Sequence, residues 1–155
     1  MEKDGRISWD DYFMQVAHLV KKRTTCIGRE VGAVIVKDKR ILATGYNGAP
    51  SGTKHCAELG GCIRRKLNIP RGERMDICRA VHAEQNVIIS AAITGSNIQD
   101  STMYITVTPC FTCAKMIINA GIKRIVIDGQ YPDELAMEIL KEANIRIERL
   151  YSKKE

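Results

Sequence analysis

The spacing of apolar and polar positions divides the chain into helices and short strands. Apolar residues recur at intervals of three and four in each predicted helix, whereas each predicted strand is a short, mostly apolar run. The predicted helices cover Trp9–Arg23, His82–Thr94, Cys110–Ala120 and Asp133–Ala143. The predicted strands cover Val31–Val36, Ile41–Tyr46, Met103–Val107, Arg124–Asp128 and Ile145–Arg149. This order of elements predicts an α/β fold, a three-layer α/β/α sandwich.

Polar and glycine positions mark several ends of these elements. Ser8 followed by Asp11 resembles a capping box, and Gly95 follows the second helix. The polar run Lys37–Arg40 separates the first two strands, which therefore form a predicted hairpin. Both strands are nearly all apolar, which predicts burial on both faces. A helix separates the last two strands, so we expect them to be parallel and joined by a right-handed crossover.

The apolar stripe of the fourth helix is predicted to comprise Leu135, Ile139 and Leu140. The segment Ala49–Val81, in contrast, has no sustained period and contains prolines, paired glycines, many charges and three cysteines. A connection of that length inside a compact domain is uncommon unless it is functional, disordered or stapled. We expect one domain over residues 1–155 with a cysteine-containing insertion at about 49–81.

Composition and charge narrow the class of protein. With 155 residues and 45% hydrophobic content, the chain fits one compact domain. The first residues lack an apolar signal segment, and no run approaches the length of a membrane span, so we expect a soluble, cytoplasmic protein. The six cysteines are then thiols or metal ligands before they are disulfides. The net charge of +6 suits nucleic acid and a small phosphorylated substrate equally well.

Two short motifs carry the candidate chemistry. They are His82-Ala83-Glu84 and Pro109-Cys110-Phe111-Thr112-Cys113. One imidazole and two thiolates can hold three corners of a tetrahedral zinc ion, and the fourth corner remains for water. Each motif lies at a predicted helix start, where free amides and the helix dipole favour thiolates. The pattern H-x-E followed by P-C-x-x-C is that of zinc-dependent nucleobase deaminases.

Glu84 is the expected general acid and base of such a site. Zinc lowers the pKa of a bound water from near 16 to about 7. Glu84 would take a proton from that water, deliver one to the ring nitrogen and later protonate the departing ammonia. Alone, each motif has an ordinary interpretation. A histidine and a glutamate are common on a surface helix, and C-x-x-C occurs in structural zinc sites and redox pairs. Their order and their shared place at helix starts favour a deaminase site.

Four segments make the chain similar to one family. They are Val31-Gly-Ala-Val-Ile-Val36, Gly45-Tyr-Asn-Gly-Ala-Pro50, Cys78-Arg-Ala-Val-His-Ala-Glu-Gln-Asn86 and Thr108-Pro-Cys-Phe-Thr-Cys-Ala-Lys115. Over nearly its whole length the chain resembles the deoxycytidylate (dCMP) deaminases of the cytidine deaminase superfamily, and the Gly-Tyr-Asn-Gly-x-Pro segment points to dCMP. The resemblance implies a five-stranded mixed sheet, a homo-oligomer that is usually a hexamer, and conversion of dCMP to dUMP for thymidylate synthesis.

The same resemblance implies substrate contacts and effectors. In that family the asparagine matching Asn47 contacts the nucleotide, and the backbone at Ala83 contacts the pyrimidine. Asn47-Gly48 is also a strong turn pair, so turn formation is an alternative role. Some members are activated by dCTP and inhibited by dTTP, which makes these nucleotides, with Mg²⁺, candidate effectors.

The monophosphate of such a substrate requires cationic or amide donors. Arg29, just before the first strand, is the first candidate, because a guanidinium group matches a phosphate in bidentate fashion. Lys54 and Arg79 are alternatives. Tyr131 could pack on the sugar or base, or could be an ordinary core or rim tyrosine.

Four cysteines remain outside the paired motif. They are Cys26, Cys56, Cys62 and Cys78. Their number suits a closed tetrahedral zinc site that would staple the insertion, although their spacing is wider than in zinc fingers. Some viral dCMP deaminases have a structural zinc with cysteines matching Cys26 and Cys56, completed there by histidines. In this chain Cys62 and Cys78 would replace them, with His55 in reserve, and small buried thiols are the alternative.

Two other functions remain open from the sequence. One is a deaminase that acts on a base within nucleic acid, such as a transfer-RNA adenosine or a DNA or RNA cytidine deaminase. The other is a zinc-stabilised DNA-binding module. With 5% aromatic residues the chain lacks the clustered stacking surface of the first, and Glu84 would have no role in the second. We therefore expect a small nucleotide as the substrate and neither a nucleic-acid nor a membrane partner.

Overall fold

The computed structural model describes residues 4–129 and 133–150. Its helices are α1 (Trp9–Val20), the 3₁₀ turn η1 (Lys21–Arg23), α2 (Ile63–Lys66), the 3₁₀ turn η2 (Met75–Ile77), α3 (Ala83–Thr94), α4 (Phe111–Asn119) and α5 (Glu134–Glu142). Its strands are β1 (Gly32–Lys37), β2 (Arg40–Tyr46), β3 (Thr102–Ile105), β4 (Arg124–Ile127) and β5 (Arg146–Arg149). Every predicted helix and strand is present, with ends within two residues of the prediction, except that α1 ends at Val20 and the last three predicted residues form the 3₁₀ turn η1.

The strands form one mixed sheet in the order β2-β1-β3-β4-β5. β1 is antiparallel to both β2 and β3, whereas β3, β4 and β5 run parallel to one another. The five-stranded mixed sheet and the parallel last pair are thus confirmed. The carboxyl ends of β3 and β4 lie at one edge of the sheet, which in α/β folds is where ligands bind.

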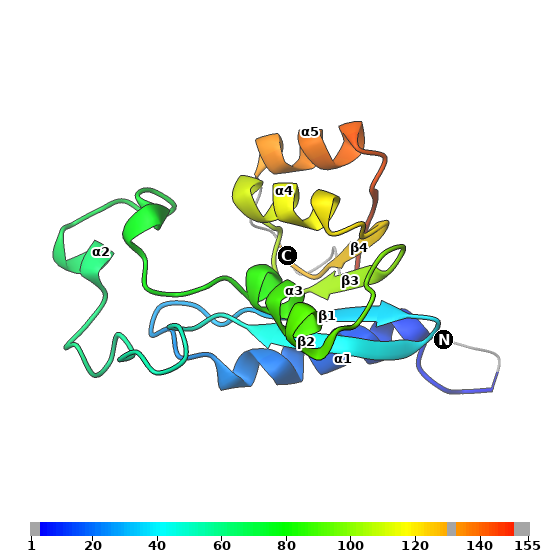
Figure 1. The fold of residues 1–155 in the computed structure, drawn as a ribbon, viewed down its shortest axis with the longest axis horizontal. Helices are drawn as coiled ribbons and strands as arrows, with labels where there is room; N and C mark the ends of the chain where they lie inside the picture. Colours follow the sequence, from blue (N-terminus) through cyan, green and yellow to red (C-terminus); the bar gives the residue numbers. More distant parts are fainter. Residues whose placement is uncertain (1–3, 130–132, 151–155) are drawn as a thin grey trace.

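Helices cover both faces of this sheet, as Figure 1 shows. On one face, side chains of α1 such as Met14 and Ala17 pack on Val34 and Val126. On the other face, α3, α4 and α5 pack together on alternate residues of β1, β3 and β4. This alternation follows from the two-residue repeat of a strand, which turns successive side chains to opposite faces. The three-layer α/β/α sandwich is confirmed.

Two expectations about burial need correction. β1 is buried along nearly its whole length, but β2 alternates between exposed and buried residues, so burial on both faces is wrong for β2. β2 is the edge strand and pairs only with β1 within the described sheet. In α5 the buried residues are Ala136 and Leu140, whereas Leu135 is 62% exposed. α5 packs mainly against α4 and β5, which leaves the side bearing Leu135 in solvent.

The start of α1 is held by the predicted cap. The backbone N–H of Asp11 donates to Ser8 Oγ at 3.1 Å, and the Ser8 hydroxyl donates to Asp11 Oδ2 at 2.7 Å. At the end of α3, Gly95 has φ 71°, a left-handed conformation that costs glycine little. Within the described residues, no helix has both the length and the apolar character needed to cross a bilayer.

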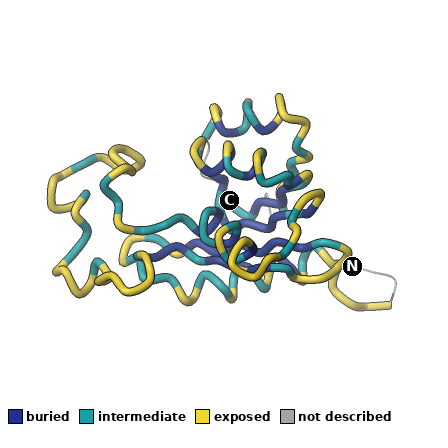
Figure 2. Tube along the Cα trace, viewed as in Figure 1, coloured by how far each residue is buried: buried dark blue, intermediate teal, exposed yellow. Residues whose placement is uncertain are grey.

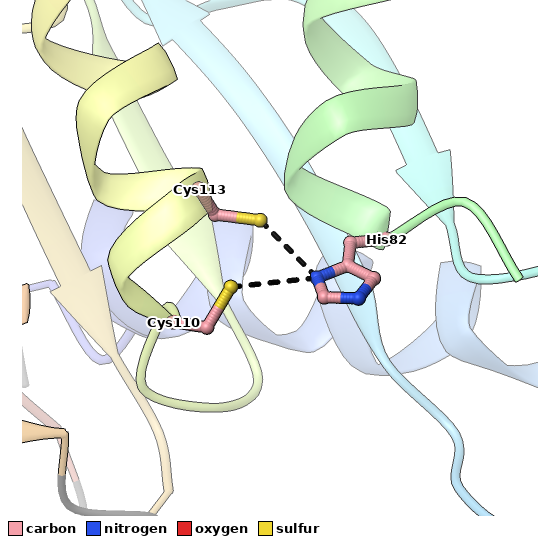
Figure 3. Close-up of side chains that lie close together, drawn as sticks. All are labelled: His82, Cys110 and Cys113. Carbon is pink, nitrogen blue, oxygen red and sulfur yellow. Dashed lines mark hydrogen bonds between the residues drawn. The ribbon is translucent and has the colours of Figure 1, made fainter. Parts of the chain in front are cut away.

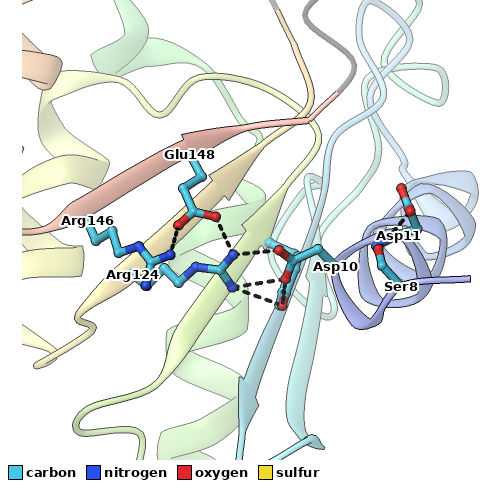
Figure 4. A network of polar contacts seen from close by, with 7 residues as sticks. Ser8, Asp10, Asp11, Arg124, Arg146 and Glu148 are labelled. Atoms are coloured by element: carbon cyan, nitrogen blue, oxygen red, sulfur yellow. Dashed lines mark hydrogen bonds and ion pairs between the residues drawn. The ribbon is translucent and has the colours of Figure 1, made fainter. Parts of the chain in front are cut away.

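A polar network fastens α1 to the sheet at the amino ends of β3, β4 and β5 (Figure 4). Arg124 Nη1 donates to Asp10 Oδ1 at 3.0 Å, Arg124 Nη2 donates to Asp10 Oδ2 at 2.6 Å, and Arg124 also pairs with Glu148. The hydrogen bond from Arg124 holds the pKa of the Asp10 carboxyl below its usual value. Burial raises the pKa of the Tyr104 hydroxyl, which donates to Asp10 Oδ1 at 2.6 Å. This network lies at the sheet edge opposite the carboxyl ends of β3 and β4.

The predicted insertion is an arm that extends away from the sheet (Figure 1). Residues 49–81, called the arm below, contain only the short elements α2 and η2, and most of them are exposed (Figure 2). Two backbone hydrogen bonds close the base of the arm. Gly48 N donates to Val81 O at 3.1 Å, and Val81 N donates to Gly48 O at 2.7 Å.

Candidate active site

The starts of α3 and α4 bring the three predicted zinc ligands together (Figure 3). His82 is the N-cap of α3, Cys110 is the N-cap of α4, and Cys113 lies in the first turn of α4. His82 Nδ1 is 3.3 Å from Cys113 Sγ and 3.6 Å from Cys110 Sγ. In the described part of the chain, this is the one group of three such ligand atoms that lie within 4.8 Å of one another.

The spacing of these atoms fits a zinc ion. With Zn–S bonds of about 2.3 Å and Zn–N bonds of about 2.0 to 2.1 Å, a tetrahedral site has N···S edges of about 3.6 Å. The two measured N···S separations are 3.3 and 3.6 Å. One imidazole and two thiolates are also a donor set that zinc prefers, and three protein ligands leave one position open.

Backbone contacts fix the orientation of these ligands. Gln85 Oε1 accepts a hydrogen bond from His82 N at 2.9 Å, the reciprocal half of a capping box. Asp133 Oδ2 accepts from Phe111 N at 3.2 Å, and Asp133 Oδ1 accepts from Ala136 N at 2.9 Å. One carboxylate thus caps α5 and also holds the first turn of α4 beside Cys110. Neither Gln85 nor Asp133 was predicted in these roles, although the position of Gln85, three residues after His82, is a pattern typical of a capping box.

The pKa values of Cys110 and Cys113 shift in opposite directions. A hydrogen bond from Cys113, with a further one from His82, lowers the pKa of Cys110 to about 4. The Cys110 thiolate and burial raise the pKa of Cys113. The hydrogen bond to Cys110 also raises the pKa of His82. A site with a preformed thiolate next to an imidazole is ready to bind a soft cation.

Glu84 lies directly beside these ligands. Its side chain is on the first turn of α3 and is 3% exposed. Burial raises the pKa of the carboxyl group, and a hydrogen bond with the Cys113 thiol opposes this effect. A carboxyl group beside the metal ligands is the type of group that serves as a general acid and base, and a raised pKa brings it closer to the pH at which it must act.

Comparison with known proteins places this site in a family. The sequence matches the family model of the cytidine and deoxycytidylate deaminase zinc-binding region over residues 7–128. The chain belongs to this family. The matched region is the zinc-binding region of that family, which agrees with the ligand geometry of His82, Cys110 and Cys113.

Relatives within the family include enzymes of fungi and phages. The deoxycytidylate deaminase of Schizosaccharomyces pombe is 39% identical over 145 residues, which are 92% of this chain and 44% of that protein. The chain thus spans less than half the length of this relative and of the Saccharomyces cerevisiae one. The deoxycytidylate deaminase of Mycobacterium phage D29 is 37% identical, and the match covers 84% of this chain and 98% of that one.

A solved structure has the same fold as this chain. The dCMP deaminase of cyanophage S-TIM5, in complex with dCMP and dUMP, is 28% identical with a TM-score of 0.77. The superposition covers 97% of this chain and 99% of that chain.

Asn47 lies at the end of β2 and binds its neighbours with both ends of its amide. It is 6% exposed. Asn47 Nδ2 donates to Arg29 O at 2.9 Å, and Asn47 Oδ1 accepts from Val31 N at 2.9 Å. Gly48 forms an antiparallel bridge with Val81, and neither Asn47 nor Gly48 lies in a turn, so the alternative role in a turn is not observed. The Nδ2 group has a second N–H, which could donate the predicted hydrogen bond to a nucleotide.

The candidate phosphate ligands lie in different places. Arg29 is half-buried, and its positive charge partly opposes the rise in the pKa of His82, which puts Arg29 within electrostatic range of the zinc ligands. Arg79 is exposed on the arm, where its Nε donates to Lys54 O at 3.2 Å, and Lys54 is exposed as well. These positions favour Arg29. Tyr131 lies outside the described residues.

Ala83 and Gly45 bring β2 and the first turn of α3 into close contact. Ala83 is fully buried, its backbone included. A side chain at Gly45 would place its Cβ 2.8 Å from Ala83 O and 2.4 Å from Val87 N. Glycine at this position therefore lets the strand reach the helix start that carries Glu84.

The four remaining cysteines lie near one another but are not in contact as a group. Burial and the charges of Cys62, Cys26 and Cys78 raise the pKa of Cys56, so all three lie within electrostatic range of Cys56. Backbone hydrogen bonds from Arg65 and Arg64 lower the pKa of Cys62, the N-cap of α2. No three of these sulfurs lie within 4.8 Å of one another. His55 Nδ1 lies 3.6 Å from Glu58 Oε1 on the exposed arm.

A hollow of about 610 Å³ lies elsewhere on the molecule, at the amino ends of β3, β4 and β5. It is lined by residues that include Asp100, Lys123, Arg124 and Arg146. Lys123 pairs with Asp100, and Arg124 and Arg146 pair with Glu148. This hollow is not the reaction site despite its size, because the zinc ligands and Glu84 lie at the opposite edge of the sheet.

Proposed function

We propose that this protein catalyses the hydrolysis of dCMP to dUMP and ammonia and so supplies dUMP for thymidylate synthesis. The observation that carries the proposal is the buried Glu84 beside the group formed by His82, Cys110 and Cys113. Zinc-dependent deaminases of nucleobases use this combination of groups. Several relatives of similar sequence are named deoxycytidylate deaminases, and the S-TIM5 structure contains dCMP and dUMP.

In this mechanism the residues of the chain bind the base and move protons. His82, Cys110 and Cys113 would hold a zinc ion, which when bound makes a water molecule acidic enough to act as a nucleophile near pH 7. Glu84 accepts one proton from the attacking water and delivers it to the ring nitrogen. It then takes the remaining proton of the hydroxyl group added to the ring carbon and gives it to the amino group, which leaves as ammonia while the carbonyl group of dUMP forms. The Ala83 backbone and the second N–H of Asn47 Nδ2 orient the nucleotide.

Ammonia release tests this function directly. Zinc-loaded protein should release ammonia from dCMP faster than from CMP, dCTP or cytosine when the four are assayed side by side. Turnover of a transfer RNA or single-stranded DNA in place of dCMP would support the nucleic-acid deaminase instead. DNA binding without any turnover would support the zinc-stabilised module.

Arg29→Ala is expected to raise the KM for dCMP about ten- to a hundredfold, with a smaller change in kcat. A hydrogen bond to a charged group contributes about 1.5 to 3 kcal/mol, which corresponds to that range of affinity. Steady-state kinetics measures the effect. Lys54→Ala is the matched control, since it removes an exposed cation from the arm and should leave KM unchanged. An unchanged KM in Arg29→Ala would exclude Arg29 as the phosphate ligand.

A second, structural zinc site is part of the proposal. Cys26, Cys56, Cys62 and Cys78 supply four thiolates, the donor set of a closed zinc site, and Cys56 lies within electrostatic range of the other three. Binding would draw the sulfurs closer together and tie the arm to the segment before β1.

Metal analysis should therefore find two zinc ions per fully loaded chain. Cys62→Ser should hold one zinc ion and unfold at a lower temperature, because structural zinc contributes directly to folding free energy. Thermal unfolding and zinc content are measured on the same samples. One zinc ion per chain in the fully loaded wild-type protein would rule out the second site.

A homo-oligomer, with the hexamer as the expected form, is also proposed. Large apolar side chains are exposed on three helices of the chain. These are Leu19, Ile93 and Leu135, at 72%, 80% and 62% exposure. Contacts between copies would cover such residues. Sedimentation equilibrium measures the state, and a monomer at assay concentration would contradict the proposal.

Regulation and location complete the proposal. Activation by dCTP and inhibition by dTTP, with Mg²⁺, stay predictions that the same ammonia assay can check. All six cysteines are free thiols, as expected in the reducing cytoplasm where we propose that the enzyme works.

A further inference from the structure

The loop between η1 and β1 carries the candidate phosphate ligand. This loop, residues 24–30 and called the Arg29 loop below, begins at Thr24 and has no helix or strand of its own. Its two ends meet at one residue of the neighbouring strand end, Asn47. The position of Arg29 therefore depends on how firmly Asn47 joins these two ends.

The Thr24 side chain holds the first end of the Arg29 loop. Thr24 Oγ1 lies 2.7 Å from Asn47 Oδ1 and 2.8 Å from Asn47 O, and both of these oxygens are acceptors. The hydroxyl donates its single hydrogen toward them and accepts a hydrogen bond from Cys26 N at 3.1 Å. A half-buried hydroxyl with partners on both sides is held in one orientation.

The Asn47 amide holds the second end of the same loop. Asn47 Nδ2 donates to Arg29 O at 2.9 Å, while Asn47 Oδ1 accepts from Val31 N at 2.9 Å. The Val31 contact assigns which end of the amide is oxygen, because a backbone N–H requires an acceptor. The Asn47 amide thus joins the Thr24 hydroxyl to the backbone of Arg29, and Thr24 Oγ1 itself lies 3.4 Å from Arg29 O.

Thr25 supports the same junction from the side of the arm. Thr25 N donates to Asn47 O at 3.3 Å, and Thr25 Oγ1 accepts from Ala49 N at 3.0 Å. Loss of the Thr24 hydroxyl would therefore loosen the Arg29 loop but leave it attached. Arg29 lies within electrostatic range of His82, so a small shift of the loop moves its guanidinium group relative to the substrate.

We propose that Thr24 is a positioning residue for Arg29 and so determines how tightly the enzyme binds the 5′-phosphate of its substrate. This inference rests on the proposed function and on Arg29 as the phosphate ligand. It predicts an effect on substrates that carry a phosphate and none on the same nucleoside without one.

The test compares dCMP with deoxycytidine in five zinc-loaded proteins. They are the wild type, Thr24→Val, Thr24→Ser, Arg29→Ala and the double variant Thr24→Val/Arg29→Ala. Valine keeps the shape of threonine but cannot make the hydrogen bonds, whereas serine keeps the hydroxyl. Thr24→Val should raise the KM for dCMP about three- to tenfold, the range of one lost hydrogen bond, with kcat within about twofold of wild type.

Three further results are expected from these proteins. Thr24→Ser should restore the wild-type KM, and Thr24→Val should leave kcat/KM for deoxycytidine unchanged. In the Arg29→Ala background, Thr24→Val should add nothing, because both changes remove the same contact. Thr53→Val is the matched control. The Thr53 hydroxyl donates to Pro50 O at 2.7 Å on the exposed arm and makes none of the contacts between Thr24, Asn47 and Arg29. The kinetics of Thr53→Val should therefore match those of the wild type.

Different failures have different meanings. A Thr24→Val variant with the wild-type KM for dCMP would overturn the role of Thr24 alone, as would equal losses on dCMP and deoxycytidine or additive effects in the double variant. Wild-type protein that releases no ammonia from dCMP would overturn the proposed function and this inference with it.

Discussion

Glu84→Gln is expected to bind zinc as the wild type does and to lose about a hundredfold to ten-thousandfold in kcat. Glutamine has nearly the same shape as glutamate but cannot exchange a proton near neutral pH, and general acid–base catalysis is worth about that factor. The buried place of Glu84 beside His82 and Cys113 gives it no other evident task, since it is not one of the three ligand atoms.

Zinc content and kcat are measured together on the same preparation. Glu138→Gln, an exposed position on α5, makes the same chemical change away from the site and should keep full activity. If Glu84→Gln retained substantial turnover with its zinc in place, another group would have to move the proton.

Cys113→Ala should lose the zinc of the active site, and turnover of dCMP should fall below about a thousandth of wild type. Activation of the attacking water by a metal contributes several kcal/mol, and 1.4 kcal/mol corresponds to a factor of ten. Cys113 also lies in a fully buried position of α4, so we expect a lower unfolding temperature as well.

Chelation of the wild-type protein separates the loss of metal from the loss of packing. Removal of zinc should abolish turnover, and added zinc should restore it in the wild type but not in Cys113→Ala. Metal analysis and ammonia release follow both steps. Full activity in protein shown to be free of zinc would contradict the proposed chemistry.

The parts of the site that the sequence predicts are those encoded by local spacing. The three ligands and Glu84 lie within one turn of two helix starts, and helix starts are marked by short patterns. The cap of α1 by Ser8 is local in the same way. Gln85 could have been found too, because its contact with His82 spans only three residues.

Other features depend on contacts that no local pattern contains. β1 and β2 have similar apolar sequences. Their different burial follows from their positions in the sheet, because β1 lies between two strands and β2 lies at an edge. The bond from Phe111 N to Asp133 joins residues 22 positions apart, and the Arg124–Asp10 pair joins residues 114 positions apart. Such pairs are fixed by the packing of elements, which spacing along the chain does not describe.

The two hydrogen bonds between Gly48 and Val81 have a consequence for how the protein can vary. These bonds hold the two ends of the arm together next to the sheet. The arm therefore joins the core through Gly48 and Val81, whatever sequence lies between them. The entropy of closing a loop grows only with the logarithm of its length, and a doubling costs about 0.6 kcal/mol. As long as the proposed zinc ligands Cys56, Cys62 and Cys78 are kept, the arm can therefore be shortened or lengthened by evolution or by design at little cost to the folded core that holds Glu84.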